Sequence, residues 1–389
     1  MPGSTGASAG SAGERGVTAR IALSPPGFLA RLLARLASPF AVGVAARVGG
    51  QAIAFVLVIV ASRHLGLEAF GVYAVAWAAA VIATTFVYTG FYHALLRATD
   101  LAAGLDTLFW LKAGVGALGS TTLLGAGLLA GGEVGAALLA VAPLPMMAVP
   151  TAWNEAQLVR AQRARAASLH LLAAETVGLG VAVWGLTAGH GLMALIVARH
   201  AVSLTSLALT ATLVRRLPRL RLRREEAREA GRTALPLWGT TGIGMFSTYG
   251  ADFVLAMFLS PAAVGAYRSG ARIAMTASDV VFQPMRMLTW SRLSRLERAD
   301  DRAGIAETWC ANMALSTAML WPAMAGVGLL AEPLVLTLFG ASWAAAAPVL
   351  AILCLSRAIS VPQALMEPAL TCAGRAGLQF RLRLASGGL

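Results

Sequence analysis

Two stretches of the sequence share one pattern: His64-Leu65-Gly66-Leu67-Glu68-Ala69-Phe70-Gly71-Val72-Tyr73 and Ser260-Pro261-Ala262-Ala263-Val264-Gly265-Ala266-Tyr267. Each separates two long apolar runs, and in each a Gly-x-Tyr triplet opens the second run. We call them the first elbow (residues 64–73) and the second elbow (residues 260–267). Such a repeat in so apolar a chain predicts two related membrane bundles, with any substrate path between them.

The composition excludes an ordinary soluble protein. Of the 389 residues, 58% are hydrophobic and only 13% are charged, whereas about a quarter of the residues of a soluble domain carry charge. Barrel strands would give alternating segments of roughly ten residues, but the apolar runs here are unbroken. We therefore predict an all-α, polytopic integral membrane protein.

A helix needs about 20 mostly apolar residues to cross a bilayer. Ten stretches meet this requirement. They are residues 41–62, 72–94, 107–130, 134–152, 168–188, 191–213, 235–258, 264–288, 307–330 and 344–366.

The arginines predict how the chain is oriented. The net charge is +13, and arginines concentrate in alternate gaps between the apolar runs, so the rule that cytoplasmic loops are positive places the N-terminus in the cytoplasm. Only Arg63 then falls on the opposite side. Arginine runs also occur in nucleic-acid-binding proteins, but the run here lacks interleaved aromatic residues. We expect a multi-pass membrane protein that binds no nucleic acid.

The same pattern predicts four regions. Residues 1–40 are expected to be a disordered tail with a possible interfacial helix, and residues 41–214 a six-helix bundle. Residues 215–233 form a basic cytoplasmic linker, predicted to be a partly helical bridge on the membrane surface. Residues 234–389 are expected to be an incomplete bundle of about four helices.

One predicted span carries an unusual polar stripe. Arg272, Thr276, Asp279, Gln283 and Arg286 recur at helical spacing, so all five lie on one face. A charge at mid-membrane costs about 2.5–3.5 kcal/mol on insertion scales. The stripe therefore predicts the wall of a hydrated cavity, and the alternative is a self-satisfied ladder buried against a neighbouring helix.

Other polar residues in the spans allow two interpretations each. Arg47 and Gln51, four residues apart in the first span, suit either a lipid headgroup or a substrate phosphate. Asp252 is expected to pair with an arginine such as Arg272, and the alternative is an ion-coupling site. Glu175 and Arg199 favour interhelical hydrogen bonding over a role in transport.

The second span has a polar and aromatic face without charge, formed by Thr85, Tyr88, Thr89 and Tyr92. It suits either a sugar-lined passage or bonding between helices. No catalytic, metal-binding or cofactor motif is recognisable in the sequence. We do not expect an enzyme.

Four motifs together resemble a known family, the polysaccharide-biosynthesis or O-antigen flippases of the multidrug/oligosaccharidyl-lipid/polysaccharide exporter superfamily. They are Leu65 to Tyr73; Leu158-Val159-Arg160-Ala161-Gln162-Arg163-Ala164-Arg165; Asp252 followed by Ala263-Val264-Gly265-Ala266-Tyr267; and Leu338-Phe339-Gly340 with Trp343 and Ala347-Pro348-Val349-Leu350. The resemblance covers residues 35–376.

The resemblance implies two six-helix bundles that face a central cavity and flip a polyprenyl-pyrophosphate-linked oligosaccharide to the outer leaflet by alternating access. By position, Arg47 and Arg272 are the nearest matches to cationic residues that meet the pyrophosphate. Membrane lipids and the polymerase or glycosyltransferases of the same pathway are the implied partners, and a bacterial inner membrane is the implied location. The chain ends soon after the tenth span, so we expect it to lack the family's last two helices.

Two alternatives stay open. A drug or cation antiporter of the same superfamily would need an acidic cavity. A membrane glycosyltransferase or ligase would need a long loop on the outer side, and every loop predicted there is short.

Overall fold

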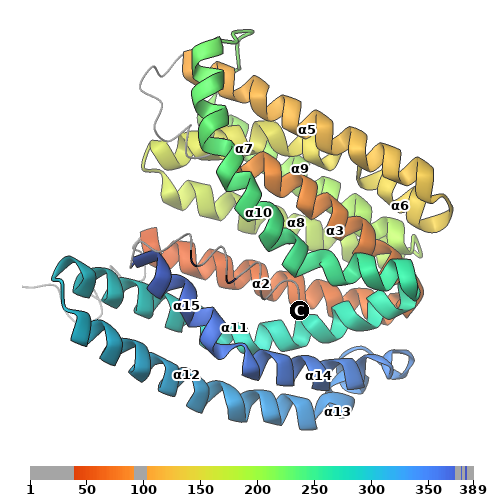
Figure 1. The fold of residues 1–389 in the computed structure, drawn as a ribbon. Coiled ribbons are helices and arrows are strands. Elements are labelled where there is room, and N and C mark those ends of the chain that lie inside the picture. The colour runs from red at the N-terminus through yellow and green to blue at the C-terminus, as the bar shows by residue number, and fades with distance from the viewer. Residues whose placement is uncertain (1–38, 92–102, 373–377, 379–381, 383–389) are drawn as a thin grey trace, which may run out of the picture.

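The computed structural model describes residues 39–91, 103–372, 378 and 382, and within these it contains helices and no strand (Figure 1). The predicted tail and interfacial helix lie almost wholly outside the described residues. The helices are α2 (Pro39–His64), α3 (Leu67–Thr89), α5 (Ala103–Ala130), α6 (Gly132–Val141), α7 (Leu144–Arg160), α8 (Ala164–Thr187), α9 (Leu192–Val214), α10 (Arg224–Phe258), α11 (Pro261–Arg298), α12 (Arg302–Leu329), α13 (Ala331–Leu338), η1 (Ala341–Trp343), α14 (Ala346–Ile359) and α15 (Val361–Cys372). We call α2 to α9 the first half and α10 to α15 the second half.

The prediction of an all-helical membrane protein is confirmed. Five stretches are long and apolar enough to cross a bilayer, and α12 with α13, bent by 67°, gives a sixth if the pair is one span. The stretches are Leu67–Thr89, Gly104–Ala130, Gly132–Arg160, Arg165–Thr187 and Leu192–Val214. The count of ten spans and the cytoplasmic N-terminus stay predictions.

Several predicted boundaries change. The span predicted at 344–366 is divided between α14 and α15, and the one at 134–152 begins in α6 and continues in α7. The spans predicted at 235–258 and 264–288 are the apolar parts of longer helices, α10 of 35 residues and α11 of 38 residues.

The segment predicted as a partly helical linker, residues 215–233, is helical from Arg224, where α10 begins. Residues 215–223 lie outside helices. Glu225 and Glu226 occupy the first turn of α10, where acidic side chains stabilise the positive end of the helix dipole. This explains why the helix extends into the charged region.

The two elbows pack against each other at the start of α3 and α11. A Cβ atom on Gly71 would overlap the carbonyl oxygen of Pro261, and a Cβ atom on Gly265 would overlap the carbonyl oxygen of Leu67. In each case the glycine lies against the residue that opens the other helix. The repeated Gly-x-Tyr triplet therefore marks a reciprocal crossing of two backbones, which only residues without a side chain allow.

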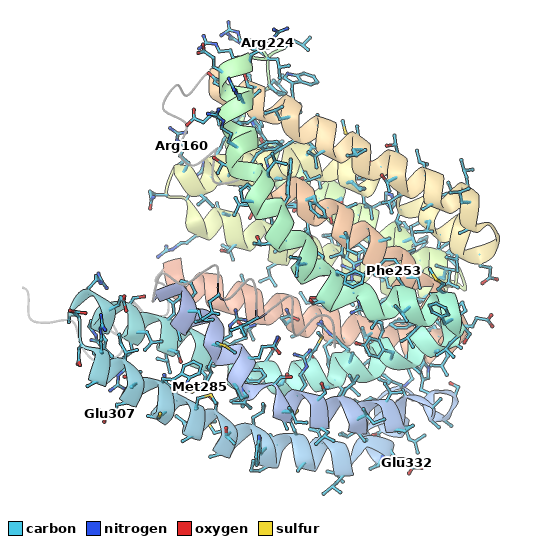
Figure 2. All side chains as sticks on the ribbon, in the orientation of Figure 1. Arg160, Arg224, Phe253, Met285, Glu307 and Glu332 are labelled. Atoms are coloured by element: carbon cyan, nitrogen blue, oxygen red, sulfur yellow. The ribbon has the colours of Figure 1, made fainter. Side chains whose placement is uncertain are left out.

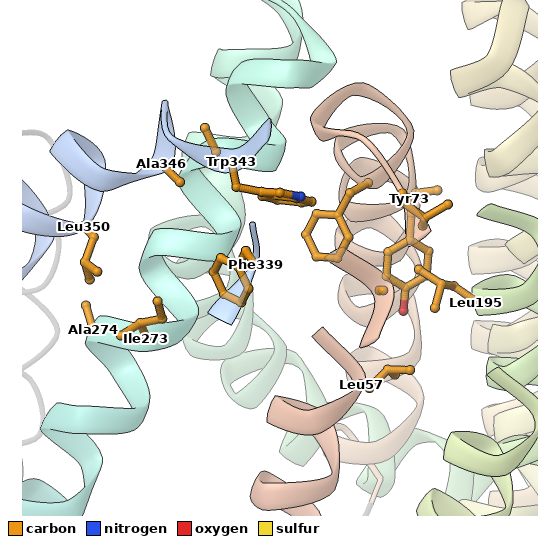
Figure 3. Close-up of a cluster of buried hydrophobic side chains, with 14 of the residues drawn as sticks. Leu57, Tyr73, Leu195, Ile273, Ala274, Phe339, Trp343, Ala346 and Leu350 are labelled. Carbon is orange, nitrogen blue, oxygen red and sulfur yellow. The ribbon is translucent and has the colours of Figure 1, made fainter. Parts of the chain in front are cut away.

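Aromatic residues close the same end of the molecule. Trp343 is fully buried, and its Nε1 donates to the carbonyl oxygen of Ser62 at 2.9 Å. Its ring meets that of Phe70 edge to face at 5.3 Å. Beside it, Arg63 donates through Nε to the carbonyl oxygen of Leu338 at 3.0 Å. One apolar core, which contains Tyr73, Leu195, Ile273 and Leu350, thus joins the two halves (Figure 3).

The opposite end is rich in arginine. Arg160 lies there at the end of α7 and Arg224 at the start of α10, while Glu332 lies at the start of α13 at the elbow end (Figure 2). The molecule therefore has an elbow end, where the halves meet closely, and an arginine-rich end.

Candidate functional site

A cavity of about 230 Å³ lies between the two halves. Helices α2, α3 and α9 of the first half and helices α10 and α11 of the second half contribute to its walls. The lining residues are Ala54, Leu57, Val58, Ala61, Phe70, Tyr73, Ala74, Trp77, Leu195, Arg199, Thr248, Tyr249, Arg268, Ala271, Arg272 and Met275. Three of them are arginines, and none is acidic.

Arg272 on α11 connects the halves across this cavity. Its guanidinium donates to the backbone carbonyl oxygen of Gln51 on α2 at 3.0 Å. Its Nε is buried without a hydrogen-bond partner in the described part of the chain. No described carboxylate lies within 4.0 Å of it, the limit for an ion pair. Arg272 is thus held in place by a neutral acceptor, and no ion pair among the described residues neutralises its charge.

Arg268 lies one helical turn before Arg272 and has a full ion pair. It binds both oxygens of Asp252 on α10, with 2.6 Å between its Nε and Oδ1, and Asp252 is fully buried. The Arg268 guanidinium also lies 4.4 Å from the centroid of the Tyr249 ring. A planar ion and a ring at this distance attract each other.

Arg199 on α9 has equivalent partners in the first half. Its guanidinium lies 3.3 Å from a carboxylate oxygen of Glu175 on α8 and 3.1 Å from the hydroxyl oxygen of Tyr73. It also lies 4.4 Å from the centroid of the Trp77 ring. Each half therefore supplies one arginine that an acid neutralises and an aromatic ring supports.

The electrostatic balance of the site is positive. The acids Glu175 and Asp252 neutralise Arg199 and Arg268 from behind, and neither lines the cavity. The charge of Arg272 stays in excess among the described residues. Charges act strongly in a cleft with apolar walls because little water screens them. The arrangement suits an anion and disfavours a cation.

The structure places the predicted site residues unequally. Arg272 lines the cavity. Gln51 does not line it, but its backbone carbonyl oxygen accepts the hydrogen bond from Arg272, and Gln51 itself is exposed. Asp252 pairs with Arg268, not with Arg272, because Arg268 lies nearest to it across the α10–α11 contact. The side chain of Arg47 lies outside the described part of the structure.

The rest of the stripe does not reach the cavity. The Thr276 hydroxyl donates to the carbonyl oxygen of Arg272 in its own helix at 2.8 Å. Asp279, Gln283 and Arg286 are half-buried further along α11 and do not line the cavity. Only the first residue of the predicted stripe is therefore a wall residue.

Two residues of the uncharged polar face predicted in the second span form hydrogen bonds within their own helix. The hydroxyls of Thr85 and Thr89 donate to carbonyl oxygens of their own helix, at 2.6 Å and 2.9 Å. Tyr92 lies outside the described residues. Neither threonine lines the cavity.

Sequence reasoning missed Arg268, although a signal was present: it lies four residues before Arg272, so it extends the stripe by one turn. The interhelical hydrogen bonding expected of Glu175 and Arg199 is confirmed, because these two side chains pair between α8 and α9. Tyr249 and Trp77 gave no signal, because aromatic residues are common in membrane helices for other reasons.

The sequence of the chain matches the family described as "Polysaccharide biosynthesis protein" over residues 59–348. A curated relative is the Succinoglycan biosynthesis transport protein ExoT of Rhizobium meliloti (strain 1021), which is 27% identical over 224 residues. The match covers 57% of this chain and 45% of that protein, so the chain spans less than half the length of this relative.

Two solved structures share the fold. The lipid II flippase MurJ in an inward closed conformation has a TM-score of 0.70 at 11% identity, covering 88% of this chain and 78% of that one. An inward-facing multidrug resistance MATE family transporter of the MOP superfamily has a TM-score of 0.67 at 14% identity, covering 86% and 83%. The helices described above are therefore arranged as in these two solved structures.

Proposed function

We propose that this chain, which belongs to the polysaccharide biosynthesis protein family, flips a polyprenyl-pyrophosphate-linked oligosaccharide across the membrane and holds its pyrophosphate between the two halves. The transported molecule would move from the inner to the outer leaflet for surface polysaccharide synthesis. The names of ExoT and MurJ support a transport reaction and a lipid-linked substrate, respectively.

One observation carries this proposal: the acid-free wall formed by Arg199, Arg268 and Arg272. A pyrophosphate diester bears negative charge on both of its phosphates. The planar fork of a guanidinium matches the oxygens of a phosphate and forms strong, charge-assisted hydrogen bonds with them. Three such groups from both halves face one space, where a charge that served only packing would be costly.

The three arginines have different roles in the proposal. Arg199 and Arg268 are each fixed by an acid and a ring, so they are ordered before a ligand arrives. Arg272 supplies the charge that no described acid balances. An incoming anion would therefore gain most from Arg272, while the other two guanidiniums offer hydrogen-bond donors in fixed positions.

Alternating access gives the route. The halves meet closely at the elbow end through Gly71, Gly265 and Trp343. In this state the substrate would enter from the arginine-rich end. Release on the other side requires the elbow contacts to separate while contacts at the arginine-rich end form, as expected for two bundles that rock around a central site.

A cation or drug antiporter of the same superfamily is the second candidate. Its substrate would need a free carboxylate in the cavity. Asp252 and Glu175 are instead each engaged by an arginine and lie behind the wall. The geometry thus favours the anionic, lipid-linked substrate.

The test is to substitute Arg272 and to express each variant in cells whose own copy of the gene has been deleted. We expect Arg272→Ala to abolish surface polysaccharide while the amount of protein in the membrane stays normal, and Arg272→Lys to retain part of it. Arg302→Ala is the matched control, because Arg302 is 92% exposed at the arginine-rich end, away from the cavity. Unchanged polysaccharide in Arg272→Ala would show that this residue serves only the structure.

A further inference from the structure

The segment that joins the two halves has an unusual surface. Residues 215–223, which we call the strap, read Arg-Arg-Leu-Pro-Arg-Leu-Arg-Leu-Arg and run between the ends of α9 and α10 without helical structure. Leu217, Leu220 and Leu222 are 87%, 86% and 63% exposed. The strap contains no acidic residue. It therefore presents leucines and arginines side by side.

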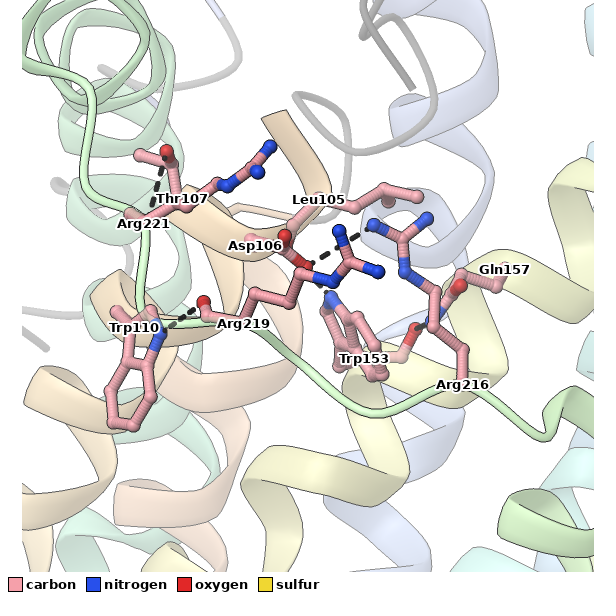
Figure 4. Close-up of polar contacts among 9 residues, drawn as sticks. All are labelled: Leu105, Asp106, Thr107, Trp110, Trp153, Gln157, Arg216, Arg219 and Arg221. Carbon is pink, nitrogen blue, oxygen red and sulfur yellow. Dashed lines mark hydrogen bonds and ion pairs between the residues drawn. The ribbon is translucent and has the colours of Figure 1, made fainter. Parts of the chain in front are cut away.

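The strap is attached to the first half at several points (Figure 4). Trp110 on α5 donates through Nε1 to the carbonyl oxygen of Arg219 at 2.9 Å. The backbone N–H of Arg223 donates to the Thr107 hydroxyl oxygen at 3.2 Å. The guanidinium of Arg216 pairs with the buried Asp106 at 3.2 Å. These contacts hold the main chain along the start of α5.

Because the main chain is fixed, the exposure of the leucines is a property of the fold. The strap bends at Leu220, where the backbone N–H of Arg221 donates to the carbonyl oxygen of Arg219 at 2.8 Å. Leu220 and Leu222 are exposed there, and so are the neighbouring Arg219 and Arg221. Leucine side chains on a fixed surface gain free energy only when something apolar covers them.

The position of the strap indicates what covers it. It begins one residue after α9, a helix apolar enough to span a bilayer, and leads directly into α10. A segment that follows directly on a helix of this kind lies at the membrane surface. At that depth leucines reach the acyl boundary, while the long arginine side chains extend to the headgroups. Cationic segments next to membrane helices attract anionic lipids.

We propose that the strap is a binding site for anionic phospholipids, in which Arg219 and Arg221 contact the headgroup phosphates and Leu220 and Leu222 insert among the acyl chains. The occupant is a lipid headgroup rather than a nucleic acid or a protein, because basic and apolar residues alternate along a segment fixed at the membrane surface. This site is separate from the cavity.

The test is hydrogen–deuterium exchange of the full chain in nanodiscs of phosphatidylcholine, with and without phosphatidylglycerol. We expect the backbone amides of residues 216–223 to exchange several-fold more slowly in the anionic discs. Arg219→Gln with Arg221→Gln should remove this difference, since each arginine near an anionic surface contributes about fivefold to binding. The control pair Arg298→Gln with Arg302→Gln, at the same end on exposed positions, should retain it.

Three results would overturn the proposal. Equal exchange in the two kinds of disc would show that headgroup charge is irrelevant. A lipid effect that persists in the Arg219 and Arg221 double variant would place the lipid elsewhere. Equally slow exchange in detergent without phospholipid would show that another part of the chain covers the strap.

Discussion

Exchange of Asp252 for asparagine tests the most completely buried ion pair of the cavity. Asp252 is fully buried and binds Arg268 through both oxygens, while the Arg268 side chain is 18% exposed. The loss of one partner of a buried pair costs about 3–5 kcal/mol, because the other charge stays behind uncompensated. Since the cavity gives Arg268 some access to water, we expect the lower end, about 3 kcal/mol. At roughly 2–4 °C per kcal/mol for domains of 150–250 residues, this corresponds to a decrease in Tm of roughly 6–12 °C.

The assay is thermal unfolding of the purified protein in one detergent, followed by tryptophan fluorescence. Asp252→Asn and Arg268→Gln should each lower Tm. In the double variant neither charge is left without its partner, so its decrease in Tm should be much smaller than the sum of the two single decreases. Arg302→Gln serves as the control, since its pair with Asp300 is more than nine-tenths exposed and such pairs contribute little. A wild-type Tm for Asp252→Asn, or strictly additive losses in the double variant, would refute the pairing.

Two further predictions concern a close contact between backbones and a buried hydrogen bond. Gly71→Ala places a methyl group against the carbonyl oxygen of Pro261, so we expect lower Tm and loss of polysaccharide export, whereas Gly66→Ala in the same elbow meets no atom within 4 Å and should behave as wild type. Equal behaviour of the two variants would argue against the close crossing. Lys112, the only lysine, is fully buried, and its Nζ donates to the carbonyl oxygen of Val87 at 2.7 Å. Lys112→Met retains the apolar stem but loses this bond, and we expect a cost of about 1.5–3 kcal/mol in thermal unfolding; a higher Tm than wild type would contradict the assignment.

The sequence revealed the features that depend on composition and on spacing within one helix. The elbows were recognisable because the Gly-x-Tyr pattern occurs twice, whereas only the structure shows that Gly71 and Gly265 lie where two backbones cross. The polar stripe pointed to Arg272 because a charge inside a membrane helix needs a polar neighbour or water. Both features are patterns of residue types that can be read along the chain without knowing how the helices pack.

Features that depend on the packing of different helices were not visible in the sequence. The pairing of Glu175 with Arg199 follows from how α8 and α9 are rotated against each other. That Asp252 meets Arg268 rather than Arg272 depends on how α10 packs against α11. Along α11, helical spacing showed that Thr276, Asp279 and Gln283 share a face, but it did not show where the cavity ends.

Reconstitution tests the central claim most directly, namely that the guanidinium-lined cavity carries a lipid-linked pyrophosphate across the membrane. Purified protein in liposomes would be supplied with a fluorescent polyprenyl-pyrophosphate-linked oligosaccharide, and its arrival in the other leaflet measured with a quencher that does not cross the bilayer. We expect transfer by the wild type and by Arg302→Ala, and background transfer by Arg272→Ala. Equal transfer by wild type and Arg272→Ala, or equal transfer of a polyprenol-linked oligosaccharide without phosphate, would contradict the account.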